Sequence, residues 1–464
     1  MMGVKRFGGL FASQLRRNIA TGMGAAILSV LLGLASYPIY LHFLGYEQYG
    51  IWLALSTVLT FAQLGNFGIN PAVTKLVAEA HGAGDTVGVR RCITTAWLVV
   101  SIAGGVVFCG VLVFKQYIPR IFNVSGANSH MMSELLPYVA LFSIGIFVVE
   151  CLNSVLVGLG RMDLESYIRI ISQAVALVCS AILLISGHGV ASLLWGNVAS
   201  YLAMHLLSLM AVRKIIGSRL LTINRDNFGE LSRMLRFGGW VSGAAVISMA
   251  LSPFNRIVLS RYVGIASLPV YDIAYGSAMR VRSLLESGLR AMMPEISRLS
   301  GTLTQHTLRR SVAMQRSGLR LIAGLGIALY GTVILIATPL LHVWLRSQFQ
   351  PALPLVFRIM LVGSFLSLLG TPGYYILLGL GEARTCFFTV AILGGASVSV
   401  LGLALIFTGA VSIVDVTLGA MAGMGLSSAF VLWRVSQLTT AYAGLPVHAQ
   451  PEEFQPEVTS GGVI

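Results

Sequence analysis

The residues most able to do chemistry are charged and polar side chains inside a long apolar segment near 263–292. They are Asp272, Tyr275, Arg282, Glu286 and Arg290. At about 100° per residue these five fall within about 80° of one helix face, whereas Arg280 points away from that face. The stripe covers a rise of about 27 Å, close to the hydrocarbon thickness of about 30 Å. The spacing therefore predicts one wet helix face that crosses a bilayer.

Arginines at membrane depth indicate a function, because each buried charge costs about 2.5–3.5 kcal/mol on insertion scales. A guanidinium stays charged and donates two parallel hydrogen bonds to a phosphate. Arg282 and Arg290 are therefore the predicted contacts for an anionic headgroup. A second interpretation stays open, in which Arg282, Glu286 and Arg290 form an i, i+4 ladder that only allows the helix to pack.

Charged residues on other apolar segments extend this set. Arg256 and Arg358 are further headgroup candidates, although both lie toward the ends of their segments, where a long side chain can also snorkel to the interface. Glu150 lies deeper, and desolvation there favours a protonated carboxyl, which suits either proton coupling or pairing with an arginine. Tyr275 can stack on a sugar or simply pack. The predicted coupling and cavity residues are Glu150, Asp272, Glu286 and Tyr275.

The elements that must position these side chains are membrane-spanning helices. Of 464 residues, 56% are hydrophobic and only 10% are charged, so the bilayer is the solvent of this chain. The apolar run after Arg16 and Arg17 is too long for a cleaved signal peptide and predicts the first span. Twelve spans are predicted, near 18–43, 48–68, 92–114, 133–157, 166–187, 190–212, 236–258, 263–292, 317–345, 353–379, 386–408 and 413–436.

The basic residues predict the orientation of these spans. With both termini in the cytoplasm, 22 of the 31 Lys and Arg residues fall in cytoplasmic segments. The opposite side keeps only Lys115, Arg120, Arg261 and Arg346. This bias favours cytoplasmic termini and an even number of spans. Topology and attraction to anionic lipid headgroups account for the formal charge of +14, and nothing indicates nucleic-acid binding.

Matches at an offset of 223 suggest that the chain is an internal duplication. They pair Gly65 with Gly288, Pro71 with Pro294 and Lys75 with Arg298. Two parallel repeats of six spans would follow, although an apolar alphabet also produces matches by chance. The predicted organisation is an N-terminal lobe at 1–215, a cytoplasmic linker at 216–235, a C-terminal lobe at 236–440 and a disordered tail at 441–464.

Gly and Pro inside spans predict interrupted helices. The candidates are the segment GNFGINP at 65–71, Pro253 and Pro372. Each frees backbone groups that hydrocarbon cannot satisfy, so such breaks are typical of helices that line a transporter cavity. An ordinary proline kink is the alternative at each site.

Sequence motifs for other chemistry are missing. The chain has no GxxxxGK[ST] phosphate loop, no HExxH and no GxSxG, and its five cysteines are scattered without CxxC spacing. We therefore expect no cofactor, no metal site and no enzymatic reaction.

Four stretches together carry a family resemblance. They are YGIWLALSTVLTFAQLGNFGINPAVTKLVAEAHGAGD at 49–85, RFGGWVSGAAVISMALSPFNRIVL, GIASLPVYDIAYGSAMRVRSLLESGLRAMMPEISRL and PLVFRIMLVGSFLSLLGTPGYYILLGLGEARTC. The chain resembles, over nearly its whole length, the lipid-linked oligosaccharide flippases of the polysaccharide transporter family in the MATE-like (MOP) superfamily. This sequence has Asn66 and Arg256 where that family often has acidic residues, which leaves the coupling ion open.

The resemblance implies an all-α polytopic membrane protein with about twelve transmembrane helices in two six-helix lobes around a central cavity. It further implies a flippase of the bacterial inner membrane that moves an undecaprenyl-diphosphate-linked sugar unit, with polysaccharide polymerase machinery as a candidate partner. Three rivals differ in sequence. A multidrug exporter requires an acidic cavity, a membrane glycosyltransferase requires large outer loops with acids or His, and a peptidoglycan-precursor flippase typically has two more spans.

Overall fold

A computed structural model describes residues 2–64, 69–217, 243, 247–289, 305–380 and 382–443, and within these residues every element is helical. The N-terminal half contains α1 (Met2–Leu64), α2 (Ile69–Gly82), α3 (Thr86–Phe114), the short α4 (Ile118–Ile121), α5 (Gly126–Gly158), α6 (Met162–Ile185) and α7 (Ala191–Ile216). The C-terminal half contains a helix over 247–262, α9 (Ser267–Leu289), α11 (Gln305–Leu345), the 3-10 helix η1 (Arg346–Gln348), α12 (Leu353–Gly379), α13 (Ala383–Thr408) and α14 (Ile413–Ala443).

The described helices account for the twelve predicted spans. Nine of them are long and apolar enough to cross a bilayer. The helix α1 holds two spans, because Gly45 adopts φ 65°, ψ −177° and folds the chain back on itself. The helix α9 is too charged to be identified by composition, and the helix over 247–262 is the twelfth. The prediction of an all-α polytopic membrane protein is confirmed.

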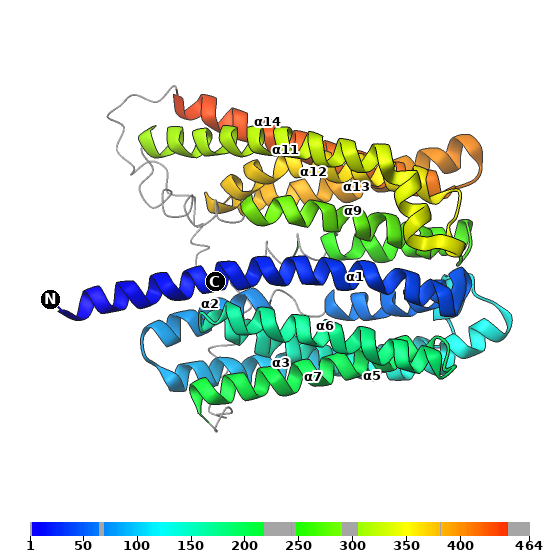
Figure 1. Ribbon diagram of the computed structural model, residues 1–464, viewed down its shortest axis with the longest axis horizontal. Coiled ribbons are helices and arrows are strands. Elements are labelled where there is room, and N and C mark those ends of the chain that lie inside the picture. The colour runs from blue at the N-terminus through cyan, green and yellow to red at the C-terminus, as the bar shows by residue number, and fades with distance from the viewer. Residues whose placement is uncertain are drawn as a thin grey trace, which may run out of the picture.

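The helices form two lobes that meet along α1 (Figure 1). One lobe packs α1, α2, α3, α5, α6 and α7 together, and the other packs α9, α11, α12, α13 and α14. Contacts between the lobes are made chiefly by α1 against α9, α11 and η1. The first span of α1 therefore lies where a path between the lobes would run.

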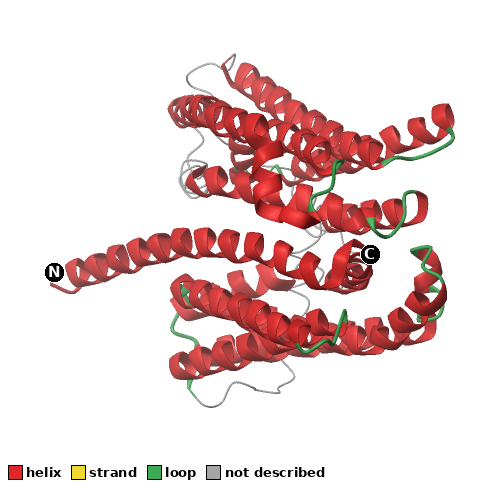
Figure 2. Ribbon diagram, turned by 45° about the vertical axis from the view of Figure 1, so that its right-hand side comes forward, coloured by secondary structure: helices red, strands yellow, loops and turns green. Residues whose placement is uncertain are grey.

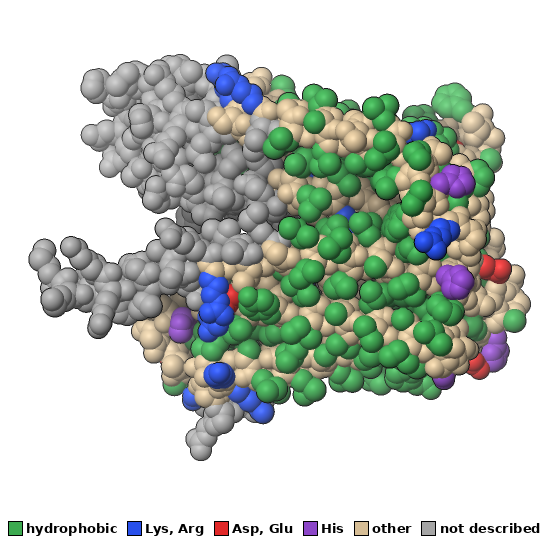
Figure 3. All heavy atoms as spheres, viewed as in Figure 1, with side chains coloured by type: hydrophobic (Ala, Val, Ile, Leu, Met, Phe, Trp, Pro, Cys, Tyr) green, Lys and Arg blue, Asp and Glu red, His purple; other side chains and the backbone are tan. Residues whose placement is uncertain are grey.

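Apolar side chains cover much of the middle of the face shown in Figure 3, and most of the charged and His side chains visible there lie toward its two ends. Loops also lie at the ends of nearly parallel helices (Figure 2). The start of α1 and the end of α14 lie at one end, which we call the terminal end, and the opposite end is the distal end (Figure 1). This arrangement suits a multi-pass membrane protein, because such apolar side chains face hydrocarbon.

Small residues bring the helices of each lobe close together. A Cβ atom on Gly370 of α12 would lie 2.3 Å from the Ser428 hydroxyl of α14, and one on Gly196 of α7 would lie 1.9 Å from the Ser180 hydroxyl of α6. Such contacts are the usual means of packing helices in lipid, where apolar burial gives no advantage. Glycine at these positions therefore serves packing within a lobe.

Two of the three predicted helix breaks are absent. The helix over 247–262 passes through Pro253, and α12 passes through Pro372, so both prolines lie inside continuous helices. The Ser428 hydroxyl of α14 donates to the carbonyl of Ser367, on the turn before Pro372, at a distance of 3.2 Å. At the third site α1 ends at Leu64 and α2 begins at Ile69.

Several sequence predictions fall outside the described residues. They are Asn66, Arg290, the matches at Gly65, Pro294 and Arg298, most of the 216–235 linker and nearly all of the 441–464 tail. The duplication and the lobe boundaries therefore stay predictions.

Candidate functional site between the lobes

The helix α9 carries most of the charges of the candidate site. It packs against α1 of the N-terminal lobe and against α12 of its own lobe. It therefore has two protein-facing sides, where the sequence predicted one wet stripe. Asp272 and Arg280 reach toward α1, whereas Arg282 and Glu286 reach toward α12. The two groups of contacts are built differently.

Toward the distal end, Arg256 and Asp272 form an ion pair across neighbouring helices. The Nη2 atom of Arg256 lies 2.6 Å from Oδ1 of Asp272, and the two side chains are only 14% and 18% exposed. The other terminal nitrogen of Arg256 donates to Ser56 at 3.0 Å and to the Leu53 carbonyl at 3.3 Å, both on α1. Arg256 thus does not snorkel to the interface; it bonds the two lobes together.

Tyr37 on the first span of α1 extends this contact toward Arg280. Its hydroxyl donates to Oδ2 of Asp272 at 3.3 Å, and Nη1 of Arg280 donates to the same hydroxyl at 3.1 Å. The Arg280 guanidinium also lies 5.1 Å from the centre of the Tyr37 ring, a cation–π distance. Gly33 leaves room for this side chain, because a Cβ atom there would lie 2.5 Å from Nη2 of Arg280.

Nearer the terminal end, Arg282 and Glu286 form the predicted i, i+4 pair. Their Nε and Oε2 atoms lie 3.4 Å apart, and the side chains are 24% and 21% exposed. Thr371 accepts from Arg282 at 3.4 Å, and Tyr375 donates to Glu286 at 3.1 Å, so α12 completes the group. The Nε atom of Arg282 is buried and has no hydrogen bond.

The charges of the candidate site do not balance. Among the described residues, Arg256, Arg280 and Arg282 face two acids, Asp272 and Glu286. Because Asp272 pairs with Arg256 and Glu286 pairs with Arg282, Arg280 is the cation that has no acid within ion-pair distance in this part of the chain. The helical periodicity had placed Arg280 outside the predicted polar stripe. The sequence feature that indicates an unpaired cation is the absence of any acidic residue one helical turn before or after Arg280.

Aromatic side chains line the same interface. Tyr271 and Tyr275 stack with ring centres 5.9 Å apart and planes 6° apart. The Tyr271 hydroxyl accepts from Asn255 at 2.8 Å, and Tyr37 meets Trp344 edge-on at 5.9 Å. The stacked pair packs within the helical bundle, and Tyr271 is 3% exposed. A sugar-stacking role for Tyr275 stays a prediction.

The other candidates lie apart from this interface. Arg358 of α12 donates to the Ile334 carbonyl at 3.2 Å and to Thr338 at 3.1 Å, both on α11 of its own lobe. Glu150 lies half-buried on α5 of the other lobe, in the electrostatic field of Arg169 and Glu165 of α6. The structure therefore does not bring Arg358 or Glu150 into the contacts made by α9.

Contacts across the lobes hold the distal end closed. Tyr46 donates to the carbonyl of Gln348 at 2.6 Å, and Ser260 donates to the carbonyl of Phe122. Gly50 lies so close to Ile265 that a Cβ atom would come within 2.2 Å of its carbonyl oxygen. Any path to the charges of α9 in this conformation must open elsewhere than at these contacts.

Comparison with solved structures shows which fold these two helical lobes have. An inward-facing multidrug resistance MATE family transporter of the MOP superfamily aligns with a TM-score of 0.75 at 13% identity, covering 92% of this chain and 99% of that one. A MOP superfamily transporter from Pyrococcus furiosus gives 0.68 at 15% identity, covering 93% and 96%. A MATE transporter of Vibrio cholerae gives 0.64 at 13% identity, covering 93% and 98%.

Sequence comparison gives the family. Residues 15–300 match the family described as polysaccharide biosynthesis protein, and no curated protein matches the chain. The chain belongs to the polysaccharide biosynthesis protein family and has the fold of the MATE transporters. Family and fold both agree with the resemblance that the sequence shows.

Proposed function

We propose that this protein is a flippase for undecaprenyl-diphosphate-linked oligosaccharides in the bacterial inner membrane. Its cargo would move from the cytoplasmic to the outer face for surface polysaccharide synthesis, and polymerase machinery would take it onward. The observation that carries the proposal is the surplus positive charge that Arg256 and the charged residues of α9 together give this site in a polysaccharide-biosynthesis protein. A diphosphate that crosses hydrocarbon needs such cations as partners.

Two features of α9 suit a phosphate ligand. Arg280 has no acidic partner among the described residues, and the Nε atom of Arg282 lies 3.4 Å from Glu286 without forming a hydrogen bond. A bound oxyanion would accept a hydrogen bond from this donor, and hydrogen bonds to charged groups contribute about 1.5–3 kcal/mol. Arg290, predicted on the same helix, would extend the cationic surface toward the terminal end. We therefore assign the headgroup to Arg280, Arg282 and Arg290.

Alternating access supplies the transport cycle. The closed contacts at the distal end support a state open toward the other end, which the bias of basic residues assigns to the cytoplasm. Cargo would bind in this state. Opening the distal end would then require the bonds from Arg256 to α1 to break. Glu150 remains a proposed coupling residue.

A multidrug cation exporter is the rival suggested by the structural neighbours. It would need surplus negative charge at the site, whereas the described residues of the site carry three arginines and two acids. The transporter from Pyrococcus furiosus is itself described as having a binding pocket of reverse polarity that suggests a different function. Pocket polarity is therefore the property that separates the two proposals.

Reconstitution in vesicles tests the proposal. A fluorescent polyprenyl-diphosphate disaccharide should move between leaflets faster with the protein than without it. Arg280→Gln and Arg282→Gln should each slow this transport at least about tenfold at unchanged thermal stability, because one charge-assisted bond is worth about 1.5–3 kcal/mol, whereas Arg261→Gln at the distal surface should not. Equal transport by all variants, or of an uncharged polyprenyl glycoside, would reject the headgroup assignment.

A further inference from the structure

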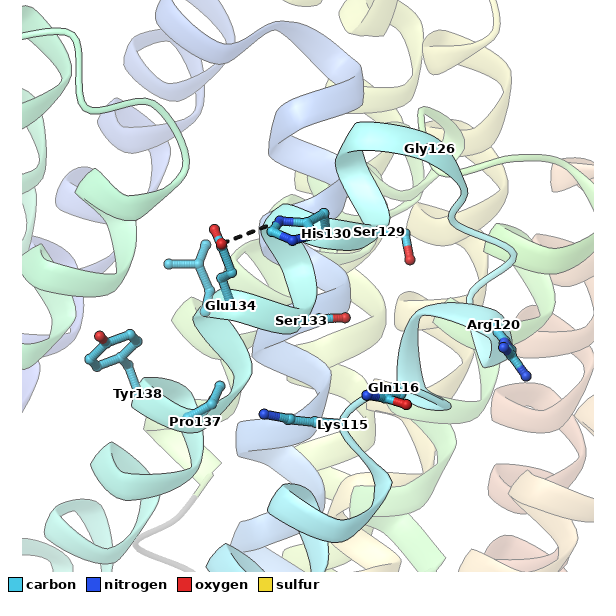
Figure 4. Close-up of a pocket in the computed structure, with 11 residues that line it drawn as sticks. Lys115, Gln116, Arg120, Gly126, Ser129, His130, Ser133, Glu134, Pro137 and Tyr138 are labelled. Atoms are coloured by element: carbon cyan, nitrogen blue, oxygen red, sulfur yellow. Dashed lines mark ion pairs between the residues drawn. The ribbon is translucent and has the colours of Figure 1, made fainter.

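A polar pocket lies at the distal end of the N-terminal lobe, away from the α9 charges (Figure 4). It has a volume of about 940 Å³ and lies between the end of α3, α4 and the first three turns of α5. Its lining includes Lys115, Gln116, Arg120, Ser129, Ser133 and Tyr138. Lys115 extends toward the side where Pro137 and Tyr138 lie, and Arg120 lies on the opposite side.

This distal pocket concentrates positive charge where the chain otherwise avoids it. Lys115 and Arg120 are two of only four Lys and Arg residues expected on the outer side. Within the described residues no acidic side chain lies within ion-pair distance of Lys115 or Arg120. The acid that lines the pocket, Glu134, pairs with His130 at 3.2 Å. Arg120 rests over the ring of Tyr117 at 5.6 Å. The pocket therefore suits an anionic group.

An apolar groove begins where the distal pocket ends. It has a volume of about 400 Å³, runs between α5 and α7, and shares Tyr138 with the pocket. Its wall includes Leu141, Gly145, Val149, Leu202 and His205. Leu141 and Leu202 are each 58% exposed on the outer surface of the lobe. A cationic pocket that continues into an apolar groove matches the two parts of a lipid.

The length of the groove indicates which lipid fits. From Tyr138 to Val149 the groove follows eleven residues of α5, a rise of about 16 Å. This is about half of the 30 Å hydrocarbon thickness, so the groove spans one leaflet. Tyr138 and Trp195 lie at its mouth with ring centres 6.1 Å apart, as aromatic residues do at a membrane interface. One phospholipid acyl chain has this length, whereas a polyprenyl carrier chain is several times longer.

We propose that the pocket and groove together bind one anionic phospholipid of the distal leaflet. Lys115 and Arg120 would hold the phosphate and headgroup, with Ser129, Ser133 and Gln116 as neutral partners, and one acyl chain would lie between α5 and α7. The α4 loop that forms one wall is also the segment whose Phe122 carbonyl accepts from Ser260 of the other lobe. A lipid bound here would therefore stabilise the loop that takes part in distal closure.

Native mass spectrometry of the purified full-length protein tests the headgroup. With dioleoyl phosphatidylglycerol and dioleoyl phosphatidylcholine in competition, we expect about a 25-fold preference for the anionic lipid, since each of the two basic residues contributes about a fivefold factor. The Lys115→Gln and Arg120→Gln double variant should lose this preference. Arg261→Gln, which removes a distal cation outside the pocket, should keep it.

Substitutions at two glycines test whether an acyl chain binds in the groove. No atom lies within 4 Å of an ideal Cβ on Gly145, so Gly145→Leu would fill the groove without a clash inside the protein. Gly105 on α3 is equally open and lies outside the groove, which makes Gly105→Leu the matched control. We expect Gly145→Leu to reduce phosphatidylglycerol binding at least fivefold and Gly105→Leu to leave it unchanged.

Two results would overturn the proposal. Equal retention of anionic and zwitterionic lipid by the unmodified protein would remove the headgroup site. Displacement of phosphatidylglycerol by a polyprenyl phosphate at an equal or lower concentration, with the same dependence on Lys115 and Gly145, would show that the carrier lipid occupies the groove instead. Neither result would bear on the α9 arginines, whose variants leave the pocket intact.

Discussion

Two charged groups on α9 differ in what they join. The group around Asp272 links the lobes, because Arg256 and Tyr37 reach it from opposite sides and Arg280 crosses to α1. The group around Glu286 lies within one lobe, because Arg282, Thr371 and Tyr375 all belong to the C-terminal half. The first group must rearrange when the lobes separate at the distal end, whereas the second can move with its lobe.

The difference separates gating from binding. A buried ion pair between moving parts contributes to the choice of conformation, and its partners must be desolvated again each time it forms. A loose pair inside one lobe keeps its place throughout the cycle, so a ligand can exchange with it without any change in lobe packing. We therefore expect Arg256 variants to change conformation and Arg282 variants to change binding.

The largest expected effect comes from Arg256→Ala. It leaves Asp272 between the lobes without its guanidinium, which should destabilise the distal-closed state by about 2–4 kcal/mol after allowance for partial exposure. Spin labels at Gln48 and Ser347, introduced as cysteines in a background without the native ones, should show a longer distance. The charge-swapped pair, Arg256→Asp with Asp272→Arg, should recover part of the closed population, and an unchanged distance in Arg256→Ala would remove its gating role.

A smaller shift in the same direction is expected from Gly50→Ala. The added Cβ atom would meet the backbone carbonyl of Ile265 at 2.2 Å in the closed state. Such overpacking typically destabilises the packed state by about 1–3 kcal/mol. The same label pair should report partial opening. Gly22→Ala on the same helix has open space around it and should leave the distance unchanged; opening in both variants would point to a general effect of the substitution on α1.

The smallest conformational effect is expected from Arg282→Gln and Glu286→Gln. Because their pair lies inside one lobe and is partly exposed, the coupling energy in a double-mutant cycle of thermal stability should stay below about 1 kcal/mol, and the label distance should not change. Transport separates the two interpretations of this pair. A phosphate-binding Arg282 predicts that the doubly neutral variant stays inactive, whereas a structural ladder predicts that it recovers.

The sequence predicted the fold and the helix that carries the site, because hydropathy and charge at membrane depth are local properties. It also predicted the pair of Arg282 with Glu286, since i, i+4 geometry is fixed by the helix. It did not predict the partners of Asp272 and Arg280, because Tyr37 lies more than 200 residues away and helix periodicity carries no information about which lobe faces which side.

The choice between a break and an ordinary kink at each proline had a related limit. At Pro253 and Pro372 the sequence shows only the lost backbone donor, whereas the continuous course of each helix through its proline is visible only in the structure. The same limit applied to Arg256, for which the sequence offered two roles, a headgroup contact or a side chain that reaches the membrane interface. Its bonds to the Leu53 carbonyl and Ser56 come from a helix that precedes it by about 200 residues.

Binding of a polyprenyl diphosphate to the purified protein tests the cation on α9 most directly. We predict that Arg280→Gln weakens this binding at least about tenfold and that a polyprenyl monophosphate binds the unmodified protein more weakly than the diphosphate. Equal affinity of the Arg280→Gln variant and the unmodified protein for the diphosphate would contradict the assignment of Arg280 to the headgroup.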